Sequence, residues 1–188
     1  SEAKMKEIEE KIVTPVIQSM VKEGRPFVGL LYPGLMLTKN GPHVLEFNAR
    51  LGDPEAQVYM RLLDTDILEI FDACIDGKLD KVEIKWEKVF AANIVLASGG
   101  YPGDYEKGKK ISGVEEAEQM SDIVVFHAGT KTVDKELLTN GGRVLGVSAT
   151  GKTLDEALAK AYKAVEKISF QGMQYRRDIG QGALKMLK

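Results

Sequence analysis

Val44-Leu45-Glu46-Phe47-Asn48-Ala49-Arg50-Leu51-Gly52-Asp53-Pro54-Glu55 is a stretch in which polar and apolar side chains alternate until a glycine and a proline interrupt the pattern. Successive side chains of a β-strand point to opposite faces, so the alternation predicts a half-buried strand. Its polar face is expected to carry Glu46, Asn48 and Arg50. Its apolar face, expected to pack on a core, carries Leu45, Phe47, Ala49 and Leu51.

Glu46 and Asn48 are candidate metal ligands. Residues two apart on a strand lie roughly 6.6 Å apart on one face, so their oxygen atoms can share a hard cation. Carboxylate and amide oxygens suit Mg²⁺, and the guanidinium of Arg50 suits a phosphate or carboxylate. The pattern therefore predicts a magnesium-bound polyphosphate. The alternative is an ordinary solvated face of an antiparallel sheet.

A sharp turn from strand to helix is predicted directly after this polar row. Gly52 breaks the strand, and Asp53 can cap a following helix. Pro54 suits the first helical position, while Glu55 places negative charge in the first turn.

The segment 46–55 resembles the signature segment of the glycinamide ribonucleotide synthetase family, the phosphoribosylamine–glycine ligases of purine biosynthesis, which are ATP-grasp enzymes. The resemblance covers nearly the whole chain. Residues 23–36 resemble the strand that precedes the signature, and residues 99–102 and 175–180 resemble the family's C-terminal domain. One departure is Leu51, where the family usually has an aromatic residue. This exchange is conservative if the side chain faces the core.

The resemblance implies an enzyme that joins glycine to 5-phosphoribosylamine with ATP, through an enzyme-bound glycyl phosphate that the amine attacks. Glu46 and Asn48 are expected to hold the Mg²⁺ or Mn²⁺ ions that bridge the ATP phosphates. Arg50 is expected to contact the transferred phosphoryl group or the acyl phosphate. The turn beside the acceptor is expected to be lined by Gly52, Asp53 and Glu55.

The implied fold is α+β, with two parts. Residues 1–80 are expected to form the C-terminal part of an ATP-grasp core, an antiparallel sheet with helices. Residues 81–188 are expected to form a small, strand-rich α+β domain. The resemblance also implies a C-terminal fragment that lacks the N-terminal part of the enzyme and is inactive alone.

Composition is typical of a globular protein. The chain has 188 residues, 44% of them hydrophobic, which is enough for one domain or two small ones. Its net charge of -2 argues against nucleic acid as a partner. No apolar run approaches the ~20 residues that span a bilayer, and no signal peptide is recognisable, so a cytoplasmic location is expected.

Hydrophobic spacing predicts the elements of the first part. Residues 3–23 have the pattern of an amphipathic helix that ends at Gly24, with a bend or break near Thr14 because Pro15 lies inside it. Residues 27–38 are expected to form a strand, joined to the signature strand by a hairpin turn around Asn40-Gly41. Two helices are expected at residues 54–63 and 67–75, the second closed by Gly77.

The second part begins after a charged stretch at residues 80–88. Strands are predicted at residues 90–97, 123–126 and 143–147. A helix with one apolar face is expected to follow, introduced by a capping box of Thr153 and Glu156. Several short strands and one helix favour a small α+β or barrel-like module over a doubly wound sheet.

Residues 146–153 match the phosphate-loop pattern G-x-x-x-x-G-K-[ST] in full, between an expected strand and an expected helix. The pattern lies near the chain's end instead of opening a βαβ series, and no strand with a magnesium-binding Asp follows. Thr153 is already explained as a helix cap. We therefore interpret the match as a coincidence.

Three other functions remain as alternatives. Another ATP-grasp carboxylase or ligase could share a Glu-x-Asn-x-Arg strand, although the Gly52-Asp53-Pro54-Glu55 extension disfavours it. The chain could be a noncatalytic interaction module that retains the fold. A phosphate-loop NTPase is the third, and it requires ATP affinity that depends on Lys152.

Overall fold

The computed structural model describes residues 2–187, without the side chain of residue 187, and the chain divides into two compact units. The first unit contains the chain up to Gly52 together with Thr65–Ile84. The second contains Asp53–Asp64 together with the chain from Lys85 onward. The segment that follows the signature strand therefore packs with the later part of the chain.

A long helical segment opens the first unit, and its parts are α1 (Glu2–Ile8), the π-helical turn η1 (Glu9–Val13) and α2 (Thr14–Lys22). The irregularity expected near Thr14 is present as this π turn, in which the Thr14 N–H donates to the carbonyl oxygen of Glu9. The wider turn accommodates Pro15, which has no N–H and crowds the turn before it. The helix ends where expected, because Gly24 adopts φ +73°.

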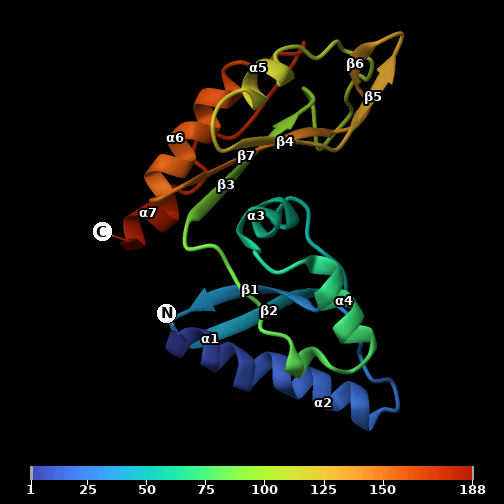
Figure 1. Cartoon of the computed structure of the whole chain (residues 1–188), viewed down its shortest axis with the longest axis vertical. Coiled ribbons are helices and arrows are strands. Elements are labelled where there is room, and N and C mark those ends of the chain that lie inside the picture. Colours follow the sequence, from blue (N-terminus) through green and yellow to red (C-terminus); the bar gives the residue numbers. More distant parts are fainter. Residues whose placement is uncertain (1, 188) are drawn as a thin grey trace. The chain divides into compact units, whose positions relative to one another are not determined.

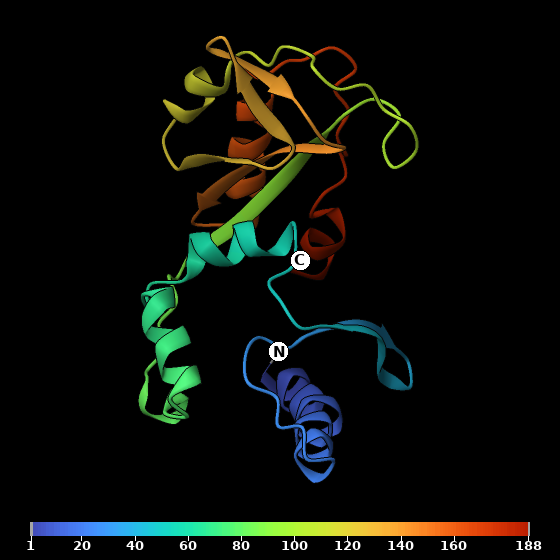
Figure 2. The same cartoon turned by 90° about the vertical axis from the view of Figure 1, so that its right-hand side faces the viewer.

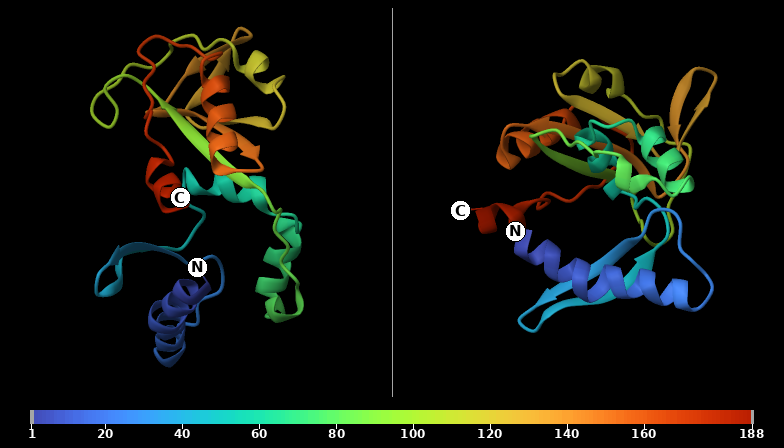
Figure 3. Two further views of the ribbon diagram at one scale, coloured as in Figure 1. Left: turned by 90° about the vertical axis from the view of Figure 1, so that its left-hand side faces the viewer. Right: turned by 60° about the horizontal axis from the view of Figure 1, so that its bottom comes forward.

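The predicted hairpin is confirmed, with β1 (Tyr32–Thr38) paired antiparallel to β2 (Gly41–Asn48). Lys39 and Asn40 form the turn, one residue earlier than expected, and Gly41 opens β2 with φ +102°. The expectation that the first strand begins at Phe27 is wrong. Gly29 adopts φ +133°, which interrupts extended backbone, and the strand begins only at Tyr32. The helical segment α1–α2 runs alongside this hairpin (Figure 3, right).

The two helices predicted after the signature are present as α3 (Glu55–Leu62) and α4 (Ile67–Ile75), and a 3₁₀ turn, η2 (Leu79–Lys81), follows. Asp66 caps α4, since its side chain accepts a hydrogen bond from the Leu68 N–H at 2.9 Å. Gly77 closes α4 with φ +66°, as expected for a helix C-terminus.

The second unit is built on a three-stranded antiparallel sheet with the order β3-β7-β4. Its strands are β3 (Phe90–Ala97), β4 (Ile123–His127) and β7 (Arg143–Gly151). The remaining elements are the hairpin of β5 (Thr130–Val133) and β6 (Glu136–Thr139), with helices α5 (Val114–Glu118), α6 (Leu154–Val165) and α7 (Gln181–Leu187). The α+β class is confirmed, and the strands of the described chain do not close a barrel.

α6 and α3 cover opposite faces of this sheet (Figures 1 and 2). The face under α6 forms the main core, which includes the fully buried side chains of Ile94, Leu96, Leu145, Val147 and Val165. The Thr153 cap is confirmed, because Thr153 Oγ1 accepts from the Glu156 N–H at 3.1 Å. The Glu156 side chain returns a hydrogen bond to the Lys152 N–H, one residue before the position that a capping box predicts. Among residues 2–187, no helix is long and apolar enough to cross a membrane.

Candidate functional site

Glu46 and Asn48 lie together near the end of β2. Asn48 Nδ2 donates a hydrogen bond to Glu46 Oε1 at 3.1 Å, so the two side chains share one face of the strand. This hydrogen bond does not involve the second oxygen of Glu46 or the amide oxygen of Asn48. The structure therefore brings the two expected metal ligands together on an accessible strand.

Gly34 makes room for this pair, a role that the sequence pattern did not reveal. It lies opposite Glu46 in the β1–β2 ladder. A Cβ atom on Gly34 would stand 3.0 Å from Cγ of Glu46, tighter than side chains normally tolerate. The ladder also shifts register between Gly34 and Leu35, and such irregularities redirect side chains next to functional sites.

Arg50 lies beyond the end of the strand, which stops at Asn48. Its guanidinium donates to the carbonyl oxygen of Leu51 at 3.1 Å. The expectation of one strand continuing through Arg50 and Leu51 is therefore wrong. Arg50 follows the Glu46–Asn48 pair in the chain, but it is not the third residue of a straight polar row.

The apolar face expected for this strand is not buried in the part of the chain that the structure describes. Leu45 is 65% exposed and Phe47 is 43% exposed. A two-stranded sheet with one flanking helix has too few neighbours to cover both of its faces. The alternation correctly separates the two sides of the strand but wrongly predicts core packing within residues 2–187.

The signature turn, which we define as Gly52, Asp53 and Pro54, differs from the expected helix cap. Pro54, not Asp53, is the N-cap residue of α3, and no side chain caps the helix there. The Asp53 carboxylate instead pairs with Arg143, whose Nη2 lies 3.1 Å from Asp53 Oδ2. Arg143 also donates to the carbonyl oxygen of Asp53 at 2.7 Å, so this one guanidinium binds both the side chain and the backbone of the residue. Glu55 opens α3 in its first turn, as expected.

Arg143 is the residue that sequence reasoning missed. It begins β7, far from the signature in the chain, and no local pattern marks it. Beside it opens a cavity of about 480 Å³ within the second unit, lined by Pro54, Val95, Ala97, Tyr101, Arg143, Gln174, Tyr175 and Arg176. Two of these lining residues, Tyr175 and Arg176, belong to the segment 175–180 in which the family resemblance was noted.

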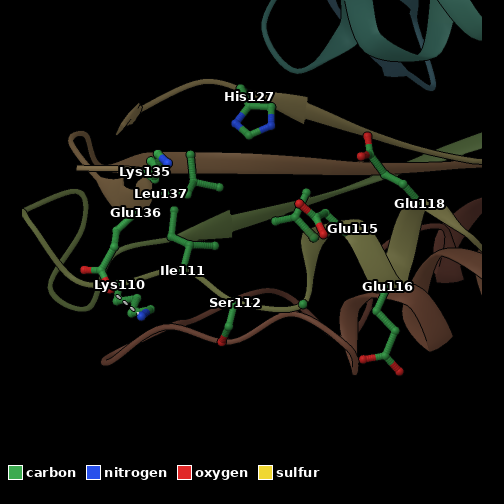
Figure 4. Close-up of a pocket in the computed structure, with 12 residues that line it drawn as sticks. Lys110, Ile111, Ser112, Glu115, Glu116, Glu118, His127, Lys135, Glu136 and Leu137 are labelled. Atoms are coloured by element: carbon green, nitrogen blue, oxygen red, sulfur yellow. Dashed lines mark hydrogen bonds and ion pairs between the residues drawn. The ribbon is translucent and has the colours of Figure 1, made fainter. Parts of the chain in front are cut away.

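A second cavity, of about 550 Å³, lies between α5 and the β5–β6 hairpin (Figure 4). Its lining includes both positively and negatively charged side chains. Lys110 forms an ion pair with Glu136, and α5 contributes three glutamates. None of the expected site residues lines it. His127, whose ring contacts Thr130 Oγ1 at 3.1 Å, is exposed at its edge.

The phosphate-loop match is a coincidence, as predicted. Gly146 and Gly151 are residues of β7, paired with Val95 and Phe90 of β3, so their backbone is part of the antiparallel ladder. A phosphate loop instead needs its N–H groups free to face a phosphate. Within residues 2–187, no three or more His, Cys, Asp or Glu side chains are grouped so that they could hold a metal ion.

Two family models match the chain. The model of the phosphoribosylglycinamide synthetase ATP-grasp (A) domain matches residues 1–56, and the model of the phosphoribosylglycinamide synthetase C domain matches residues 91–182. Together they cover most of the sequence, and both belong to one family.

Curated relatives agree with these models. The phosphoribosylamine–glycine ligase of Caldanaerobacter subterraneus is 51% identical over 178 residues, covering 95% of this chain and 42% of the relative. The ligase of Rhodopirellula baltica is 48% identical, and the match covers 97% of this chain and 42% of that relative. This chain thus spans less than half the length of these relatives.

Solved structures support the fold. The crystal structure of phosphoribosylamine–glycine ligase from Thermotoga maritima has a TM-score of 0.78 at 38% identity, covering 95% of this chain and 42% of that one. N5-carboxyaminoimidazole ribonucleotide synthetase from the same organism has a TM-score of 0.55 at 19% identity, a likeness of fold alone.

Proposed function

The chain belongs to the phosphoribosylglycinamide synthetase family, and we propose that it supplies part of the active site of a phosphoribosylamine–glycine ligase. Its membership confirms the resemblance and the ATP-grasp type of fold expected from residues 46–55. The observation that carries the proposal is the Glu46–Asn48 pair on β2, in which Glu46 is exposed and Asn48 half-buried, with Asn48 Nδ2 3.1 Å from Glu46 Oε1.

The proposed reaction has two steps. A carboxylate oxygen of glycine attacks the γ-phosphorus of ATP, which forms glycyl phosphate and releases ADP. The amine nitrogen of 5-phosphoribosylamine then attacks the carbonyl carbon, phosphate leaves, and the nitrogen loses a proton. Both steps bring anionic groups together, so the site must offset their repulsion.

Glu46 and Asn48 fit a divalent cation by their donor chemistry. One carboxylate and one amide are oxygen ligands of the kind that Mg²⁺ takes from a protein when phosphates and water complete its coordination. A bound Mg²⁺ or Mn²⁺ would neutralise phosphate charge as the phosphoryl group moves. In this proposal, Glu46 and Asn48 hold the cation through oxygens that their mutual hydrogen bond does not use.

The other expected site residues have smaller proposed roles. Arg50 is proposed to contact the transferred phosphoryl group, for which it must exchange its hydrogen bond to the Leu51 carbonyl. Gly52, Asp53 and Glu55 are proposed to line the turn beside the acceptor. Asp53 already binds Arg143, so its contribution is to hold the turn more than to bind substrate.

The wider assignments are proposals of the same kind. ATP, glycine and 5-phosphoribosylamine are the proposed substrates, and the cytoplasm is the proposed location. We also propose that residues 1–80 continue the ATP-grasp domain and that residues 81–188 form the small C-terminal domain. The remaining part of the active site is proposed to come from the portion of the relatives that this chain does not match.

The test is a chimera in which this chain replaces the matching segment of the Caldanaerobacter subterraneus ligase. Purified chimera should release phosphate from ATP only when glycine and 5-phosphoribosylamine are both present. Glu46→Gln keeps the size of the side chain but removes its charge, and we expect it to lower kcat by at least about 100-fold.

Glu87→Gln is the matched control, because Glu87 is an exposed glutamate outside the signature segment. Its kcat should remain within about twofold of the unmodified chimera. Unchanged turnover in Glu46→Gln would refute the assignment of the site. A folded chimera without ligase activity would instead favour a noncatalytic module.

A further inference from the structure

The helix α3 is docked on its sheet by arginines at both of its ends. At its N-terminal end, Arg143 of β7 contacts Asp53, two residues before the helix begins. At its C-terminal end, Arg61 of α3 donates to the carbonyl oxygen of Asp122 at 2.8 Å. All of these residues lie in the second compact unit.

Arg143 holds both the backbone and the side chain of Asp53. Its Nη1 donates to the carbonyl oxygen of Asp53 at 2.7 Å, while its Nη2 lies 3.1 Å from Oδ2 of the carboxylate. The second carboxylate oxygen accepts from Gln57 Nε2 at 3.1 Å. The planar guanidinium presents its N–H donors in a fixed fork, a geometry that the ammonium of a lysine lacks, so Arg143 constrains both the position and the orientation of Asp53.

The anchor of this contact is rigid. Arg143 is the first residue of β7, the central strand of the sheet, and the next residue, Val144, is fully buried. Asp53 itself is exposed and lies in a turn. The arginine therefore joins an exposed turn to the central strand of the sheet.

Apolar packing alone does not fix α3 on this face of the sheet. Asn93 of β3 and Ser148 of β7 are opposite each other in the ladder, and both are on the side away from α6. Their side-chain polar atoms are buried without a hydrogen-bond partner among the described residues, as are Oε1 of Gln57 and Nε of Arg61. Unpaired polar atoms do not hold the helix in place, so the directional contacts of Arg143 and Arg61 contribute to the position of α3.

We propose that Arg143 is a positioning residue for ligation, which acts by holding the signature turn through Asp53. The inference rests on the proposed function, because the position of this turn affects ligation only if the turn belongs to the active site. Asp53 is three residues beyond Arg50 in the chain, so the turn that Arg143 holds continues directly into the segment that carries Arg50. Misplacement of a reacting group by about 1 Å can cost on the order of 100-fold in rate.

The kinetic test compares three variants of the chimera. Arg143→Met should lower kcat at least about tenfold, with the KM for ATP changed less than about threefold, since the turn and not nucleotide binding is affected. Arg143→Lys restores the charge without the fixed planar geometry and should recover only part of kcat. Arg61→Met loosens the other end of α3 and is the matched control, with kcat expected within about twofold.

An equal loss of kcat in Arg61→Met and Arg143→Met would overturn the proposal, because it would show a general structural role. Unchanged kcat in Arg143→Met would overturn it as well.

Hydrogen exchange of this chain alone gives a second measurement that needs no catalysis. Arg143→Met should speed exchange of the amides at residues 58 and 59, the first of α3 with an acceptor in the helix, at least about tenfold. Arg61→Met should mainly affect residues 61–63. Unchanged exchange at residues 58 and 59 would overturn the proposal even if ligation is lost. If ligation does not depend on Glu46, the proposed function fails, and the exchange result still decides whether Arg143 holds the turn.

Discussion

Replacing Ile94 by Ala should unfold the second unit at much lower denaturant concentration. Ile94 is fully buried in the core between the sheet and α6. Removing three carbon atoms costs about 2.4 kcal/mol at roughly 0.8 kcal/mol per methylene. A residual cavity of roughly 50 Å³ adds about 1 kcal/mol. The expected loss in the free energy of unfolding is therefore about 3.5 kcal/mol, and Ile94→Val should lose about 1 kcal/mol.

Urea denaturation of the full chain measures this loss. Trp86 is the only tryptophan of the sequence and lies in the second unit, so its fluorescence reports on that unit. Val133→Ala is the control, since Val133 is 44% exposed on β5 and should change stability by less than about 0.5 kcal/mol. A loss below about 1 kcal/mol in Ile94→Ala would show that this core is not packed as the structure has it.

Three other predictions concern the second unit. Gly113→Ala should lower the free energy of unfolding in urea by at least about 2 kcal/mol, because Gly113 has φ +83° and a Cβ there would collide with the Lys167 carbonyl. Gly108→Ala, at φ +78° with open space, should cost about 1 kcal/mol, and equal losses of stability in the two variants would contradict the collision. Lys152→Ala should leave the ATP affinity of the chimera unchanged, as measured by calorimetry, because the preceding glycines belong to β7; a weakened affinity would revive the phosphate-loop hypothesis. Hydrogen bonds from Lys160, and then from the Lys152 N–H, hold the pKa of Glu156 below its ordinary value. The stability that Glu156 contributes is therefore present above about pH 4.5 and is lost as the pH falls through the lowered pKa. Glu156→Gln should lower the thermal midpoint at pH 7, and the difference from the unmodified chain should shrink in acid; a difference independent of pH would contradict this.

Local patterns predicted the features that depend on neighbouring residues. The helix cap of Thr153, the hairpin beside Gly41 and the irregular helix around Pro15 were all predictable, because each follows from contacts within a few residues. The pairing of Glu46 with Asn48 was predictable for the same reason, since a strand repeats every two residues.

Contacts between distant residues could not be predicted in this way. Asp53 has the composition and position of a helix cap, yet its carboxylate binds Arg143, which no periodicity connects to it. Leu45 and Phe47 form an apolar side as expected, but their burial depends on what lies beside the strand. A sequence pattern distinguishes the two faces of an element without specifying the partner of either face.

Manganese binding tests the central claim most directly, that Glu46 and Asn48 jointly hold a divalent cation with the phosphates of ATP. Mn²⁺ can be titrated into the chimera with ATP and followed by electron paramagnetic resonance. We predict that Glu46→Gln and Asn48→Ala each weaken nucleotide-dependent Mn²⁺ binding at least about tenfold, while Glu87→Gln does not. Equal Mn²⁺ affinity in all four proteins would contradict the account.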